Sequence, residues 1–255
     1  MRLLKLTMAS RIFFLLAAML YWSAWAGEVQ VAVAANFAAP MRQIVSSFEQ
    51  NTGHKIAYSV GATGKFYAQI KNAAPFDILL SADQTTPEQL RREREADGAT
   101  QFTYAVGKLV LWSANPQLVD EQGDVLKFSD RFRHLAIASP KLAPYGVAAI
   151  ETLRSLQLLD GLAVKLVQGE SIGQTYAFIA TGGAELGFIA LSQVMENNKI
   201  KSGSVWVVPE KLYKPLRQDA ILLKHGKDNP VALALLAFLK TESAKKIIRT
   251  FGYQI

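Results

Sequence analysis

The sequence predicts an α/β protein of two lobes, each a mostly parallel sheet flanked by helices, with two crossing strands that join the lobes. Short apolar runs, several of them β-branched, alternate with amphipathic helical patterns through most of the chain. This alternation is typical of largely parallel sheets covered by helices. The same order of strand, turn and helix occurs on both sides of a long extended run at residues 102–113, which predicts a second lobe built like the first.

The first 26 residues are expected to be a cleaved export signal. Three basic residues precede an uncharged apolar stretch, residues 12–25, which ends in Ala24-Trp25-Ala26. A basic start, an apolar run and an A-x-A sequence are typical of a secretory signal peptide. A membrane anchor is the weaker alternative, because a span needs roughly 20 apolar residues. We therefore expect cleavage after Ala26.

Composition and charge exclude several classes of protein. Loss of the three basic residues of the signal lowers the formal net charge from +7 to +4, and acids interrupt the densest basic cluster, at residues 91–95. A nucleic-acid partner is therefore not expected. The chain has no cysteine, which excludes disulfides, thiol catalysis and a lipid anchor on cysteine, and indicates a free periplasmic protein. His54, His134 and His225 match no metal-binding motif.

The first part of the mature chain alternates strands with helices. Met41, Ile44, Val45 and Phe48 share one face of a helix, and Pro40 suits its first turn. The extended run at 102–113 is long enough to pass from one lobe to the other. The elements expected before that run are strand 29–34, helix 40–50, strand 55–60, helix 65–72, strand 77–81 and helix 87–96.

The second part repeats this layout and ends in two helices. A second crossing strand is predicted at residues 220–224. The first lobe would then comprise residues 27–106 and 219–255, and the second lobe residues 107–218. The expected elements are strand 135–139, a helix from 144, strand 163–167, a helix ending near 181, strand 185–190, and helices 230–239 and 242–250.

Four turns between strands and helices are candidates for ligand binding. In parallel α/β sheets a ligand lies beyond the carboxyl ends of the strands, where helix N-termini present unpaired N–H groups that suit anions. Any one such turn is ordinary, and Asn36 or Thr63 alone fits a helix cap or a turn. The turns are Ala34-Ala35-Asn36-Phe37, Gly61-Ala62-Thr63-Gly64, Ala143-Pro144-Tyr145-Gly146 and Glu170-Ser171-Ile172-Gly173.

In order and context, these turns resemble those of the periplasmic molybdate-binding proteins of molybdate ABC transporters, over nearly the whole mature chain. The resemblance implies a type II periplasmic binding fold, a monomer that closes on one molybdate or tungstate ion, a membrane permease as partner, and no cofactor. Besides the first turn, the motifs that support it are 59–64, Ala74-Pro75-Phe76-Asp77, Ser81-Ala82-Asp83, 140–146 and 185–192.

The resemblance also implies which residues bind the oxyanion. Asn36 and Thr63 would be the donors of the first lobe, and the backbone N–H groups of Tyr145 and Ile172 those of the second, with no side chain bound directly to the metal. Ala35 replaces a hydroxyl residue of some relatives, so only its backbone can contribute.

Ala190 stands where some members of the family have a tyrosine, so that hydroxyl donor is missing here. The hydroxyl of Tyr145 is the candidate replacement.

Two alternatives stay open. Gly169-Glu170-Ser171-Ile172-Gly173 matches the G-x-S-x-G motif of serine hydrolases, with His225 downstream. A secreted serine hydrolase that uses Ser171 is therefore the rival from another class, although no H-G-G-G-type oxyanion loop is present. Within the resemblance, the ligand could instead be another anion such as sulfate or phosphate.

Overall fold

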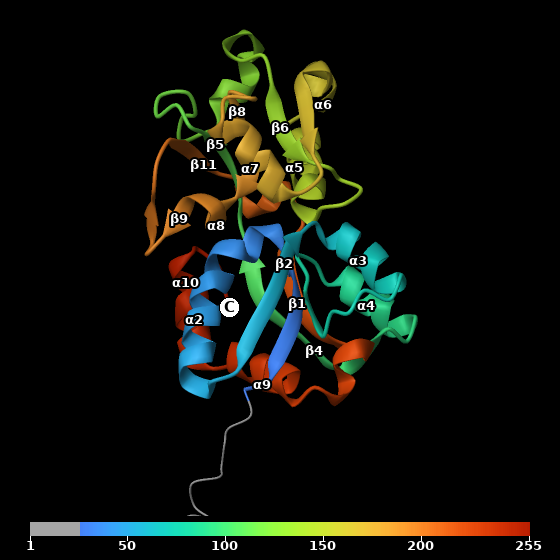
Figure 1. Cartoon of the computed structure of the whole chain (residues 1–255). Helices are drawn as coiled ribbons and strands as arrows, with labels where there is room; N and C mark the ends of the chain where they lie inside the picture. The colour runs from blue at the N-terminus through green and yellow to red at the C-terminus, as the bar shows by residue number, and fades with distance from the viewer. Residues whose placement is uncertain (1–25) are drawn as a thin grey trace, which may run out of the picture.

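The structure is a computed structural model that describes residues 26–255, and it has two lobes, one above the other in Figure 1. The predicted signal peptide lies, except for Ala26, outside the described residues. Within residues 26–255, no helix combines the length and apolar character that a membrane span needs. Each lobe contains a five-stranded sheet, and separate apolar cores form around the two sheets.

The sheet of the first lobe lies between two helical layers because its strands are apolar on both faces. Val29, Val31 and Val33 of β1 pack with α2, α9 and α10, and Ala32 faces α3 and α4. The strand order is β2-β1-β3-β12-β4. The elements are β1 (Glu28–Ala34), α2 (Ala38–Thr52), β2 (Lys55–Gly61), α3 (Thr63–Lys71), β3 (Ile78–Leu80), α4 (Thr85–Arg92), β4 (Ala96–Gly107), β12 (Leu216–Leu223), α9 (Pro230–Leu239) and α10 (Glu242–Thr250).

The second lobe repeats this plan with the strand order β11-β5-β8-β6-β7. Its core includes the fully buried side chains of Leu111, Ile137 and Phe188, one from each of the three central strands. A short hairpin of β9 and β10 follows α8. The elements are β5 (Leu109–Ser113), β6 (Leu135–Ala138), α5 (Pro144–Ser155), α6 (Leu159–Leu162), β7 (Leu166–Gly169), α7 (Ile172–Ala180), β8 (Leu186–Ala190), α8 (Leu191–Val194), β9 (Met195–Glu196), β10 (Lys199–Ile200) and β11 (Ser204–Val207).

In each sheet four strands point the same way and one runs against them, so both sheets are mixed. The opposed strands are β12 in the first sheet and β5 in the second. Each follows a crossing between lobes: β5 follows β4 through Lys108, and β12 follows β11 through residues 208–215. The other strands run toward the space between the lobes and end there. A strand that enters a sheet from that space begins there, so it runs in the opposite direction.

The predicted fold class is confirmed, and so is the crossing within residues 102–113. The second crossing is not at 220–224, because those residues up to Leu223 belong to β12 inside the first sheet. The helix predicted to end at residue 96 ends at Arg92, since Arg94 has a left-handed φ of 62° and β4 begins at Ala96. β7 begins later than predicted, after a 3-10 turn, η5 (Ala163–Lys165). The residues at which each lobe ends stay a prediction.

Candidate functional site

The four predicted turns meet between the lobes. β1 leads into the 3-10 helix η2 (Ala35–Phe37) and β2 into α3, while the second lobe contributes the turns that begin α5 and α7. These turns line a small cavity, and no residue that lines it in the described chain is charged. The lining residues are Ala34, Ala35, Asn36, Gly61, Ala62, Thr63, Ala82, Ala143, Pro144, Tyr145 and Ile172.

All five residues predicted for the site line this one cavity: Ala35, Asn36, Thr63, Tyr145 and Ile172. Each is buried, with at most 8% of its surface exposed. The structure thus brings together residues that lie up to 137 positions apart, from Ala35 to Ile172.

Backbone N–H groups at helix starts are the main donors that these turns offer. Thr63 and Ile172 are the first residues of α3 and α7. Tyr145 is the second residue of α5, after Pro144, which has no N–H of its own. The first N–H groups of a helix have no acceptor within the helix, and the helix dipole adds partial positive charge there. The arrangement therefore suits an anion held by uncharged groups.

The side chain of Thr63 can add a further donor. Its Oγ accepts a hydrogen bond of 3.1 Å from the backbone N–H of Ala82, two residues after strand β3. A hydroxyl has one proton and two lone pairs. The bond from Ala82 occupies a lone pair and leaves the proton of Thr63 for a ligand.

The side chain of Asn36 is held by other residues. Its Nδ2 donates to Oε1 of Gln218 at 2.8 Å and to the hydroxyl of Tyr253 at 2.9 Å. An amide nitrogen has two hydrogens, so both are in use. The donor that Asn36 can offer to an anion is therefore its backbone N–H, in the first turn of η2.

The hydroxyl of Tyr145 bonds to the first lobe as an acceptor and, like that of Thr63, keeps its own proton. It accepts a hydrogen bond of 3.1 Å from Nε2 of Gln218, on β12 of the first lobe. Burial raises the pKa of Tyr145 well above its ordinary value, so the hydroxyl stays neutral. Ala190 is fully buried and its N–H donates to Gln193.

Contacts across the cleft show that the lobes are closed. The N–H of Gly64 in α3 donates to the carbonyl of Leu142 at 2.9 Å. Oγ of Ser192 in α8 donates to the carbonyl of Asn36 at 2.7 Å. Lys65 pairs with Glu170 at 2.5 Å, with 45% and 64% of their side-chain surfaces exposed.

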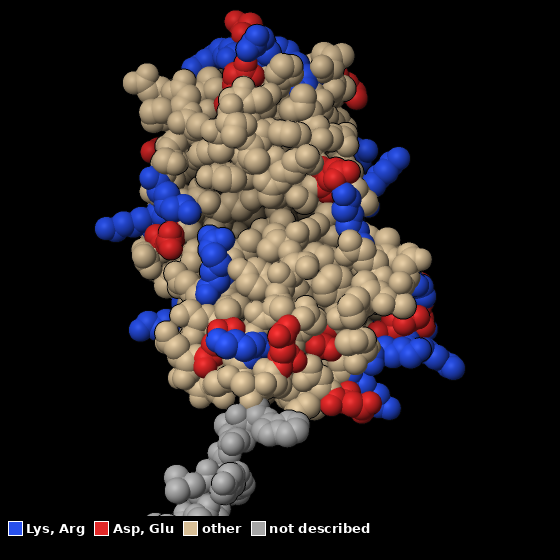
Figure 2. All heavy atoms as spheres, viewed as in Figure 1, with Lys and Arg blue, Asp and Glu red and all other residues tan. Residues whose placement is uncertain are grey.

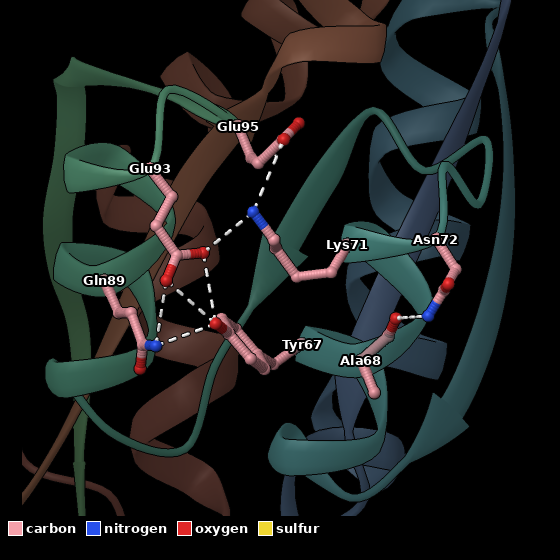
Figure 3. Close-up of polar contacts among 7 residues, drawn as sticks. All are labelled: Tyr67, Ala68, Lys71, Asn72, Gln89, Glu93 and Glu95. Atoms are coloured by element: carbon pink, nitrogen blue, oxygen red, sulfur yellow. Dashed lines mark hydrogen bonds and ion pairs between the residues drawn. The ribbon is translucent and has the colours of Figure 1, made fainter.

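A polar cluster on the outer side of the first lobe supports the helix that begins at Thr63. In Figure 3, Tyr67 and Lys71 of α3 reach the carboxylate of Glu93, just after α4, with contacts of 2.9 Å and 3.1 Å. Hydrogen bonds from Gln89, and then from Lys71 and Tyr67, lower the pKa of Glu93. The cluster ties α3 to α4 at the end of α3 remote from the cavity.

The residues of the hydrolase alternative are far from one another. Oγ of Ser171 caps α7 by accepting a bond of 3.2 Å from the N–H of Gln174. His225 pairs with Asp77 at 2.8 Å, in a hollow that includes Glu28, the first residue of β1. The cavity lies at the last residue of β1, Ala34. A seven-residue strand spans about 20 Å, so His225 cannot activate Ser171.

On the face of the molecule drawn in Figure 2, charges of both signs are mixed. Figure 2 shows basic and acidic side chains scattered over both lobes, with wide uncharged areas between them, including much of the waist between the lobes.

The sequence pattern shared by the family of bacterial extracellular solute-binding proteins matches this chain over residues 29–254. The chain belongs to this family. This solute-binding protein is 56% identical over 237 residues to the molybdate-binding protein ModA of Azotobacter vinelandii, a match that covers 93% of this chain and 94% of that one. It is 51% identical over 228 residues to ModA of Rhodobacter capsulatus, a match that covers 89% of this chain and 88% of that one.

The solved structure of the Azotobacter vinelandii periplasmic molybdate-binding protein has the same fold. It superimposes on this solute-binding protein with a TM-score of 0.86 and 40% identity, over 89% of this chain and 99% of that one. Membership of a solute-binding family, together with the separation of Ser171 from His225, identifies the protein as a binding protein and not an enzyme.

Three buried residues that hold the site together carry no signal in the sequence. Gln218, Ser192 and Tyr253 form hydrogen bonds with Asn36 from positions 156 to 217 residues away. No local motif marks them, because each acts on a turn that is close only in the folded protein.

Proposed function

We propose that this periplasmic solute-binding protein binds molybdate, or the closely similar tungstate, between its lobes and delivers it to the membrane permease of an ABC importer. The observation that supports the proposal best is the uncharged cavity that gathers backbone N–H groups from both lobes. The names of the two relatives at 56% and 51% identity support molybdate as the ligand.

The geometry suits a doubly negative ligand. Hydrogen bonds to charged groups contribute about 1.5 to 3 kcal/mol each. Several such bonds, together with the dipoles at the starts of α3, α5 and α7, can offset the cost of taking a dianion out of water. We assign this role to the backbone N–H groups of Asn36, Thr63, Tyr145 and Ile172, to that of Ala35, and to the hydroxyl of Thr63.

Fixed neutral donors also select among anions. A lysine would attract any anion as a point charge, whereas a cage of donors at set positions discriminates by size. A donor-only cavity disfavours a protonated oxyanion, because an O–H would face an N–H. Phosphate, which is protonated at neutral pH, and the smaller sulfate should both bind poorly.

Donors from both lobes explain why the ligand would close the protein. An anion that contacts both lobes binds the closed form more tightly and shifts the equilibrium toward it. We infer that the closed monomer is the form that docks on the permease.

Calorimetry of the mature protein tests the proposal. Molybdate and tungstate are expected to bind one ion per chain, and sulfate or phosphate in excess should leave the molybdate isotherm unchanged. Absence of binding by molybdate would exclude the proposed ligand. Displacement of molybdate by sulfate or phosphate would show that the cavity does not select as proposed.

A further inference from the structure

Gln218 is a fully buried amide that bonds to both lobes at once. Its Oε1 accepts from Nδ2 of Asn36 at 2.8 Å and from the hydroxyl of Tyr104 at 3.1 Å. Its Nε2 donates to the hydroxyl of Tyr145 at 3.1 Å. Asn36 belongs to a cavity turn of the first lobe and Tyr145 to a cavity turn of the second, while Gln218 itself does not line the cavity.

The local backbone is built around this contact. The pairing of β12 with β4 shifts register between Gln218 and Asp219, and such bulges re-aim side chains. On β4, Gly107 leaves room for the pair: a Cβ there would lie 2.0 Å from the hydroxyl oxygen of Tyr145 and 2.6 Å from Nε2 of Gln218. The bond therefore forms at the crossing point between the lobes.

We propose that Gln218 is a positioning residue that latches the closed state, by linking the Asn36 turn of one lobe to the Tyr145 turn of the other. The inference rests on the proposed function, since it assigns both turns to the bound oxyanion. Of the bonds that Gln218 makes, those to Asn36 and Tyr104 lie within the first lobe, and only the bond to Tyr145 spans the cleft. Opening breaks that bond, so the latch should slow ligand release.

The side chains that form hydrogen bonds with Gln218 are neutral, so these bonds do not depend on pH near neutrality. Burial raises the pKa of Tyr104 and Tyr145 well above the ordinary value and that of Tyr253 to about 12. All three hydroxyls stay protonated at physiological pH.

The test compares molybdate association and dissociation rates in Gln218→Met, Tyr145→Phe and the double variant. Each single change removes the same cross-lobe bond, and Tyr145→Phe keeps the ring and the backbone N–H. We expect dissociation to become about five to ten times faster, association to change less than about twofold, and the double variant to match the single ones. Tyr104→Phe is the matched control, because it removes a bond to Gln218 within one lobe; it should leave dissociation within about twofold.

The outcomes separate the latch from the proposed function. No molybdate binding by the unaltered protein would overturn the function and the latch together. Binding by the unaltered protein, with unchanged dissociation in Tyr145→Phe or with additive effects in the double variant, would overturn the latch alone. A loss of affinity that comes only from slower association would also overturn it. If Gln218→Met fails to fold, the comparison of dissociation rates between Tyr145→Phe and Tyr104→Phe decides whether the latch exists.

Discussion

The hydroxyl of Thr63 is buried, and the N–H of Ala82 occupies one of its lone pairs. The proton is thus the part of the group left for a ligand. A residue placed in this way contributes through one atom, so its role can be tested by changes that alter little else.

Thr63→Val should weaken molybdate binding by about 1.5 to 3 kcal/mol, or about tenfold to a hundredfold, because it removes one bond to a charged ligand and also the acceptor of the Ala82 N–H, while it keeps the shape. Thr63→Ser keeps the hydroxyl and should bind nearly as well as the unaltered protein. Calorimetry measures both. Equal affinity in the valine and serine variants would show that the hydroxyl does not contact the anion.

The residues that line the cavity could be predicted in part as a set, but their hydrogen bonds could not be predicted atom by atom. The turns are local, so strand, turn and helix patterns located them, and the resemblance to molybdate-binding proteins then selected Asn36, Thr63, Tyr145 and Ile172, which line one cavity. The orientation of Asn36 depends on Gln218 and Tyr253, which are 182 and 217 residues away. A single sequence carries no signal for such a pairing.

The buried hydroxyl of Tyr253 is expected to lower the free energy of unfolding at alkaline pH. Burial raises its pKa from 10.0 to about 12. Between these values the folded protein keeps the proton and the unfolded chain loses it, so stability falls as pH rises from 10 through 12. From pH 9 to 11 this effect amounts to roughly 1 kcal/mol.

Urea unfolding at the two pH values measures the effect. Tyr253→Phe should lose less stability over this interval than the unaltered protein, while the other buried tyrosines still contribute. An identical loss in both proteins would contradict the assignment.

At the scale of elements, helix α5 presents Tyr145 to the cavity because it packs closely on β6. A Cβ at Gly146 would lie 2.2 Å from the carbonyl oxygen of Ala138, a backbone atom that cannot move aside. The start of the helix is therefore fixed against the sheet, and the N–H of Tyr145 with it.

Gly146→Ala should push the start of α5 off the sheet, lower stability by about 1 to 3 kcal/mol and weaken molybdate binding. Gly161→Ala in α6 is the matched control, because a Cβ there meets nothing within 4 Å. Thermal melts and calorimetry measure both variants. Normal binding by Gly146→Ala would show that the position of α5 is not critical.

Most elements were predictable because their apolar patterns are strong, as in the alternation of β1, the apolar face of α2 and the short continuous run of β8. The second crossing was misplaced for a physical reason. β12 has buried side chains along nearly its whole length, so sequence alone does not show where it leaves one lobe and joins the sheet of the other. Its partners β3 and β4 decide this, and they lie more than 100 residues earlier in the chain.

At the scale of the whole molecule, closure brings Lys65 and Glu170 together at the rim of the cleft. Both side chains are well exposed, and exposed ion pairs contribute little. If neutral donors bind the anion, this lysine is not the source of the binding charge.

Lys65→Met should therefore change the Kd for molybdate by less than about threefold, and by less still at higher salt. Glu170→Gln removes the other charge of the pair, and its Kd for molybdate should change by a similarly small factor. A loss of tenfold or more in Lys65→Met alone would indicate that the cation contributes directly to binding.

The return of β12 to the first sheet also bears on the order of folding. The second sheet is complete once residue 207 has emerged, whereas the first has a gap between β3 and β4 until residues 216–223 arrive. In a chain delivered N-terminus first, the lobe that begins first is thus finished last. Until then the edges of β3 and β4 are unpaired and open to other chains. A polypeptide cut short before Leu216 is expected to aggregate even though its second lobe is whole.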